Sequence, residues 1–208
     1  MALDITQMIQ LKLFYLFMNA DGNYAEKETE KIDLICKQEK ATKTDRDELD
    51  NFIKCFEFEI DEDNSDYVIK IIDTILNKKI EITNSLGKTI SIPVSKSLFS
   101  IDIVKNDKVL QIHTLWTMIN IGYADTDYSQ PEKNIVEFLA GKWGVKPILL
   151  STMIDTADTL ASLTMQKEWV LSTNKTEEEK NEQIETIDKD MKKMYKDVEI
   201  CIANAKLI

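Results

Sequence analysis

Hydrophobic residues recur three and four positions apart over most of the chain, which is the period of an α-helix with one buried face. The first stretch predicts a helix over residues 5–19 that ends at Asp21-Gly22, and a second helix begins at Ala25. Capping signals predict further helices from Thr44 through Phe56 and over residues 65–77. Five glycines and three prolines leave few turns for a many-stranded sheet, so we expect a mostly α-helical fold.

The pattern then repeats at a constant offset of 104 residues. Ala20-Asp21-Gly22-Asn23-Tyr24 with Glu28 returns as Ala124-Asp125-Thr126-Asp127-Tyr128 with Glu132. The flanking apolar positions also align, as in Leu11 with Leu115, Phe14 with Met118, Phe17 with Ile121, Ile32 with Val136 and Ile35 with Leu139. The sequence therefore predicts duplicated helix-loop-helix halves at about residues 5–40 and 109–142.

Between the copies the period changes to two. Ile80, Ile82, Ile90 and Ile92 alternate with polar residues on either side of a turn signal at 84–87. This pattern predicts a small β-hairpin near residues 80–93. An irregular connector is the alternative, because a two-stranded hairpin is marginal unless it packs on helices.

After the second copy, the chain predicts a long helix over residues 147–170 and a last helix capped by Thr176 and Glu179. The last helix carries a heptad-like apolar stripe of Ile184, Ile187, Met191, Met194, Val198 and Cys201. We expect residues 171–208 to fold back as a C-terminal helical hairpin on a domain of residues 1–170. Self-association through the stripe, or a partner helix, is the alternative.

The composition of the chain limits the partners and the compartment that we expect for it. The formal charge of −11 and a pI near 4.7, without a Lys/Arg cluster, exclude nucleic acid as the expected partner. Cys36, Cys55 and Cys201 are widely spaced, and we expect three buried thiols in a reducing, cytoplasmic compartment. We expect no secretory leader and no direct membrane insertion, because the apolar stretches are too short.

The duplicated loops are the candidate site. Their oxygen-bearing residues are Asp21, Asn23 and Glu28 in the first copy and Asp125, Asp127 and Glu132 in the second. Oxygen ligands at alternate loop positions, with a carboxylate one turn into the next helix, suit a hard divalent cation such as calcium or magnesium, although neither loop is an EF-hand. If the halves pack about a pseudo-twofold axis, the loops could pool their carboxylates. The alternative is that these acids only accept loop amides and complete helix caps.

Catalytic signals are absent. His113 is the only histidine and is expected in the core, and no nucleophile-elbow, zinc or phosphate-loop spacing is present. The three tryptophans are expected to pack in the core and the hairpin, and Tyr24 and Tyr128 to pin each loop to its helix. We therefore predict a binding protein with no catalytic or organic-cofactor residues.

The segments Phe17 to Gly22 with Tyr24 and Glu28, and Ile121 to Asp125 with Tyr128 and Glu132, resemble the TerB-like family over roughly residues 3–165. That family includes tellurite-resistance TerB proteins and the amino-terminal domain of membrane-anchored DnaJ-type co-chaperones. The resemblance implies an all-helical fold of two related halves, an acidic face suspected of binding metal, and a protein partner in a bacterial stress response at the inner membrane.

The chain departs from this pattern at several places. Thr126 replaces the glycine, Pro131 enters the second helix start, and the isoleucine-rich stretch and the last hairpin have no family counterpart. Two hypotheses remain open. One is a TerB-like metal-binding or acidic adaptor protein, and the other is a protein-interaction or dimerisation module without metal.

Overall fold

The computed structural model describes residues 3–23, 25–77, 81–83, 89–91 and 107–205. The described chain is mostly helical, which confirms the predicted fold class. It divides into two compact units, Met1–Gly144 and Val145–Ile208. This boundary differs from the predicted one at residue 170, because the first long C-terminal helix packs along the last helix and belongs to its unit.

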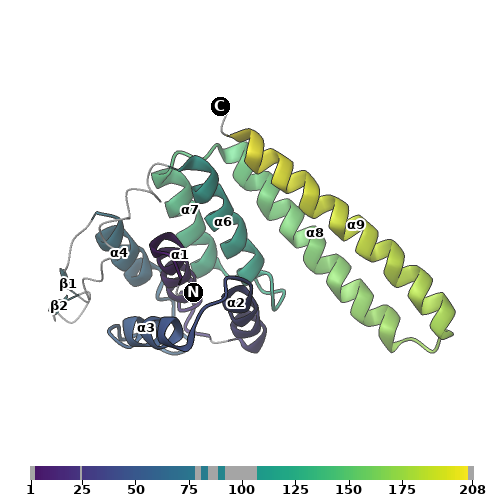
Figure 1. Ribbon diagram of the computed structural model, residues 1–208, viewed down its shortest axis with the longest axis horizontal. Coiled ribbons are helices and arrows are strands. Elements are labelled where there is room, and N and C mark those ends of the chain that lie inside the picture. The colour runs from purple at the N-terminus through teal and green to yellow at the C-terminus, as the bar shows by residue number, and fades with distance from the viewer. Residues whose placement is uncertain (1–2, 24, 78–80, 84–88, 92–106, 206–208) are drawn as a thin grey trace. The chain divides into compact units, whose positions relative to one another are not determined.

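The first unit is built around its first helix (Figure 1). Its helices are α1 (Ile5–Phe17), α2 (Glu26–Gln38), α3 (Lys43–Ile53), α4 (Ser65–Leu76), α6 (Lys108–Gly122) and α7 (Gln130–Lys142). Helix α1 contacts α2, α3, α4 and α6, and its Leu11, Leu13 and Leu16 are almost fully buried. A helix that is apolar on most of its circumference belongs in the middle of a bundle.

The backbone repeats at the offset seen in the sequence. Helices α2 and α7 have bounds that differ by 104 at both ends. Gly22 and Thr126 both have a left-handed backbone, with φ of 69° and 75°, and so do Lys40 and Gly144, with φ of 59° and 60°. Each copy thus ends both of its helices with the same change of backbone direction.

The two copies meet at equivalent residues. Gln10 Nε2 on α1 donates a hydrogen bond of 3.0 Å to Thr114 Oγ1 on α6, across a separation of 104 residues. In an arrangement related by a twofold axis, equivalent residues near the axis touch each other. This contact between α1 and α6 is consistent with such a pseudo-twofold arrangement.

Helix starts follow the capping residues, with one correction. Ser129 and Glu132 form the predicted capping box at the start of α7. The cap of α3 is Thr42, two residues before the predicted cap Thr44, because Thr42 and Asp45 form the capping box in place of Thr44 and Asp47. Asp45 also accepts the backbone N–H of Leu3, a long-range contact that the local signal does not contain.

Two short strands lie in the isoleucine-rich stretch. Strands β1 (Glu81–Thr83) and β2 (Thr89–Ser91) pair antiparallel, with Ile82 opposite Ile90. The rest of the predicted hairpin lies outside the described residues.

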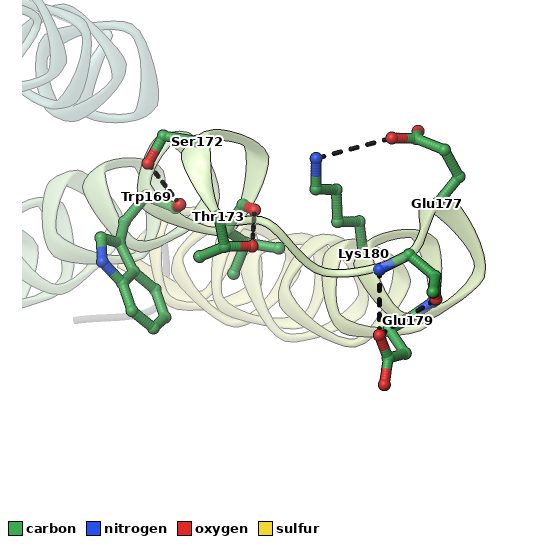
Figure 2. Close-up of polar contacts among 8 residues, drawn as sticks. Trp169, Ser172, Thr173, Glu177, Glu179 and Lys180 are labelled. Atoms are coloured by element: carbon green, nitrogen blue, oxygen red, sulfur yellow. Dashed lines mark hydrogen bonds and ion pairs between the residues drawn. The ribbon is translucent and has the colours of Figure 1, made fainter.

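The second unit is a pair of long antiparallel helices, α8 (Pro147–Ser172) and α9 (Glu177–Asn204) (Figure 1). Figure 2 shows the turn between them, where the Ser172 and Thr173 hydroxyls donate to the carbonyls of Trp169 and Val170. Thr176 and Glu179 form the predicted capping box of α9.

The buried stripe of α9 ends one residue later than predicted. Ile202 is fully buried, whereas Cys201 is exposed. Ile184 and Ile202 are 18 residues apart, which is five turns at 3.6 residues per turn, so a straight helix returns to the same face at Ile202.

Two other core predictions are corrected in part. Cys36 is buried, but Cys55 is only partly buried, so the chain does not hold three buried thiols. Trp116 and Trp143 are buried, but Trp169 is 60% exposed at the tip of the hairpin. Both residues exposed against expectation, Cys201 and Trp169, lie in the two-helix unit.

Candidate functional site: a carboxyl pair between the two halves

The two acidic loops have the same local geometry. Asp21 Oδ1 accepts the N–H of Asn23 at 2.9 Å, and Asp125 Oδ1 accepts the N–H of Asp127 at 3.0 Å. Each aspartate thus closes a turn with the residue two positions on, as the capping interpretation expects. Asn23 and Asp127 are exposed, whereas both aspartates are half-buried.

Behind these loops, Glu28 and Glu132 meet. Their side chains are 3% and 2% exposed and are hydrogen-bonded to each other. Because they stand 104 residues apart, they are a second equivalent pair in contact, after Gln10 and Thr114. The structure therefore brings the two predicted glutamates together, at the first turns of α2 and α7.

The two glutamates are not held alike. Glu132 Oε2 accepts the N–H of Ser129 at 2.7 Å and its hydroxyl at 2.9 Å. The residue equivalent to Ser129 is Ala25, and α2 has no side-chain cap, so the capping role predicted for Glu28 is wrong. The Glu28 side chain is instead hydrogen-bonded to Glu132 of the second copy.

Burial and nearby negative charge favour a shared proton between the two carboxyl groups, because they raise the pKa of both. Glu132 Oε1 is buried and finds no N–H or hydroxyl donor among the described residues. Burial raises the pKa of both groups, and the hydrogen bond between them raises the pKa of Glu28 further and offsets part of the rise for Glu132, as expected when Glu28 is the donor. Two ionised carboxylates in contact would repel each other strongly, and a shared proton removes that cost.

Burial and negative charge act on both groups. Burial raises the pKa of Glu28 most, and the charges of Glu132, Asp125 and Asp21 raise it further. Burial also raises the pKa of Glu132, but the hydrogen bonds from Ser129 and Glu28 offset part of this effect. Asp21 and Asp125 are therefore close enough to act on the pair electrostatically.

One wall of the site depends on a glycine. A methyl group at Gly122 on α6 would lie 2.6 Å from the ring of Tyr128 and 2.9 Å from Glu132 Oε1. Tyr128 is 5% exposed, and its ring packs on Tyr123 with centroids 4.9 Å apart. Burial first, and then the charge of Glu132, raises the pKa of the Tyr128 phenol. Gly122 thus makes the room in which the tyrosine ring and the carboxylate pack.

Backbone hydrogen bonds join the first acidic loop to residues 61 and 64, a contact that the sequence repeat did not predict. Asp61 N–H donates to the Gly22 carbonyl at 3.1 Å, and Asn64 N–H donates to the Ala20 carbonyl at 2.7 Å. A methyl group at Gly22 would lie 2.4 Å from the Glu59 carbonyl oxygen, so only glycine fits there. The acidic segment 57–63 therefore lies directly against the first loop.

The predicted metal residues separate into three groups. Glu28 and Glu132 are in contact, Asp21 and Asp125 lie close by, and Asn23 and Asp127 are exposed on the loops. Within the described part of the chain, no three acidic, histidine or cysteine side chains converge as a metal-ligand group. His113 is half-buried on α6, not fully buried as expected.

Sequence reasoning missed two asymmetric positions of this site. Gly122 aligns with Met18, and Ser129 with Ala25, and both differences were visible at the offset of 104. A glycine inside an apolar helix is the signal that could have identified the first, because glycine there costs helix stability unless packing requires it.

The site and fold define a mostly helical protein with a buried carboxyl pair at the first turns of α2 and α7. No protein-family model, curated protein or solved structure matches the chain. Of the helices that the structure describes, none combines the length and apolarity needed to cross a membrane.

Proposed function

We propose that the first unit is a non-enzymatic, TerB-like module that binds a hard divalent cation, calcium or magnesium, at Glu28 and Glu132. Asp21 and Asp125 supply further oxygen ligands, with Asn23 and Asp127 at the rim. The observation that carries the proposal is the contact of two buried glutamates that hold equivalent positions in the two copies of the sequence repeat.

The chemistry of the pair supports a cation. Two buried carboxyl groups in contact need a positive charge between them, which is either a proton or a metal ion. Glu132 Oε1, which has no N–H or hydroxyl donor among the described residues, offers a carboxylate oxygen as a ligand. All six candidate residues bind through oxygen, the donor that calcium and magnesium prefer.

A second candidate function has its own support. Asp21 and Asp125 already accept loop amides, so the loops are stable without an ion. The exposed acids around them and the net charge of −11 suit a basic surface on a protein partner. This candidate is a cytoplasmic acidic adaptor without metal, acting with stress-response machinery at the inner membrane, as the resemblance to tellurite-resistance proteins implies.

Calorimetry separates the two functions. We expect calcium or magnesium to bind the full chain at pH 7 with release of about one proton, because the cation replaces the shared proton. Repeating the titration in buffers of different ionisation enthalpy measures that release. Glu28→Gln and Glu132→Gln should abolish binding, whereas Glu26→Gln, an exposed acid in the first turn of α2, should leave it unchanged.

The adaptor hypothesis makes the opposite prediction. The absence of heat, and of any shift in melting temperature, with calcium, magnesium, manganese and zinc would overturn the metal proposal. If both glutamine variants still bind the cation, its site does not include Glu28 and Glu132.

A further inference from the structure

The carboxyl pair of Glu28 and Glu132 is shut off from water. The two side chains are 3% and 2% exposed, and Glu132 Oε1 is buried. Helix α6 packs against both α2 and α7, which carry the pair, and its Gly122 closely approaches Glu132 Oε1. A cation that binds these oxygens must therefore give up most of the water that surrounds it in solution.

The ring of Tyr128 forms a second wall of the site. A methyl group at Gly122 would lie 2.6 Å from Tyr128 Cδ2 and 2.9 Å from Glu132 Oε1, so the ring edge and this oxygen approach the same point. The ring is itself held in place, because the Tyr123 ring lies 4.9 Å from its centre and the Lys133 ammonium lies 5.3 Å from it. An aromatic ring and a helix backbone thus occupy the space beside the oxygen.

Calcium and magnesium differ in how readily they lose water. Magnesium is the smaller ion, demands near-ideal octahedral geometry and keeps several of its waters in most protein sites. Calcium accepts about six to eight oxygen ligands in a flexible geometry, and carboxylates replace its waters more readily. A dry site with fixed walls therefore favours calcium.

The available oxygens also suit an irregular geometry. Asp21 Oδ1 and Asp125 Oδ1 accept loop amides, and Glu132 Oε2 accepts two hydrogen bonds from Ser129. Glu132 Oε1 and the second carboxylate oxygens of Asp21 and Asp125 accept no hydrogen bond from the part of the chain that the structure describes. Together with Glu28, these oxygens come from two helix turns and two loops, and calcium tolerates such a mixed set better than magnesium does.

We propose that the site selects calcium over magnesium by excluding water, and that the ring of Tyr128 sets this selectivity. The inference rests on the proposed cation site, and it adds the identity of the ion and the wall that selects it. Tyr128 acts through its ring as a barrier to water, and its hydroxyl is not a ligand.

Separate titrations with the two ions test the selectivity. Calorimetry of the full chain at pH 7, after removal of bound ions with a chelator, should show calcium binding about tenfold or more tightly than magnesium. An absence of binding by either ion would overturn the proposed cation site, and this inference with it. Equal affinity for the two ions, or tighter binding of magnesium, would overturn the inference alone.

Two substitutions separate the ring of Tyr128 from its hydroxyl. Tyr128→Phe keeps the wall and should keep the calcium preference of the wild type. Tyr128→Ala leaves a space that water can enter, so magnesium should bind with its own waters and the preference should fall towards equal affinity. Circular dichroism checks that both variants keep their helices. Loss of the preference in Tyr128→Phe, or a folded Tyr128→Ala that keeps it in full, would overturn the role of the ring.

Luminescence tests the exclusion of water without any substitution. Europium(III) is close to calcium in size, and its emission lifetimes in H2O and D2O give the number of waters on the bound ion. In the wild type, europium that calcium can displace should keep no more than about two waters. A displaceable europium ion that keeps most of its waters would overturn the proposal, whether or not Tyr128→Ala folds.

Discussion

Replacing Glu28 with glutamine should stabilise the first unit at neutral and alkaline pH. Glutamine has almost the same shape, and its amide can donate to the Glu132 carboxylate as the protonated glutamate does. Unlike glutamate, it never ionises. The variant therefore keeps the hydrogen bond and removes the cost of burying a second negative charge beside Glu132.

The size of the effect follows from the direction of the pKa shift. Because the folded pKa of Glu28 is raised above its ordinary value of 4.5, the native state binds more protons than the unfolded state above that pH. Stability then falls as pH rises from 4.5 towards the folded pKa, by up to about 1.4 kcal/mol per pH unit. At pH 7, about 2.5 units above the start of this window, glutamine should gain about 3 kcal/mol.

Urea unfolding with chelator present measures this gain. Trp169→Phe restricts the fluorescence signal to Trp116 and Trp143 in the first unit. Glu28→Gln should reduce the fall in stability between pH 5 and 8 to the part that the raised pKa of Glu132 causes, whereas exposed Glu26→Gln should change stability by less than about 0.5 kcal/mol. If Glu28→Gln is less stable than the wild type at pH 8, or keeps the full pH dependence of the wild type, the two carboxyl groups do not share a proton.

Three further predictions concern packing. Gly122→Ala should destabilise the first unit by about 1–3 kcal/mol, because its methyl group overlaps a buried ring. Gly141→Ala has open space around its methyl group and should stabilise the unit by about 1 kcal/mol. Urea unfolding of both variants measures these changes, and equal effects would contradict the close approach at residue 122. Thr126→Gly should stabilise by about 1 kcal/mol by relieving a positive φ, and Thr126→Ala, the control, should not. A thiol reagent should label Cys201 in the folded chain at once but reach Cys36 only on unfolding, and rapid labelling of both would refute the burial of Cys36.

The repeat explains how much of the first unit could be predicted. Helix ends followed from local signals such as Ser129 with Glu132, because capping involves residues three positions apart. The predicted start of α3 was wrong because Thr42 and Thr44 offer the same local capping signal. The structure uses Thr42 with Asp45, and Asp45 also accepts the backbone N–H of Leu3. Local patterns therefore identify helices reliably but do not choose between equivalent caps.

The contact between Glu28 and Glu132 was beyond sequence reasoning for a different reason. The pattern identified both residues and raised a pseudo-twofold axis as a condition, but it did not say which side chains would lie on the axis. That depends on how α2 and α7 pack against the helices between them, which is set by side-chain volumes across the whole unit. The offset could equally have placed the two glutamates on opposite surfaces.

Divergence between the copies bears on how the proposed site works. In a symmetric pair, neither glutamate would be favoured as the holder of the proton. The change from Ala25 to Ser129 gives Glu132 two hydrogen bonds that stabilise its charge, so the proton stays on Glu28. A divalent cation between the carboxylates would displace that proton and let both glutamates bind as anions, which restores their equivalence. Replacing Ser129 with alanine should then raise the pKa of Glu132 and weaken cation binding, because the pair would hold its proton more tightly.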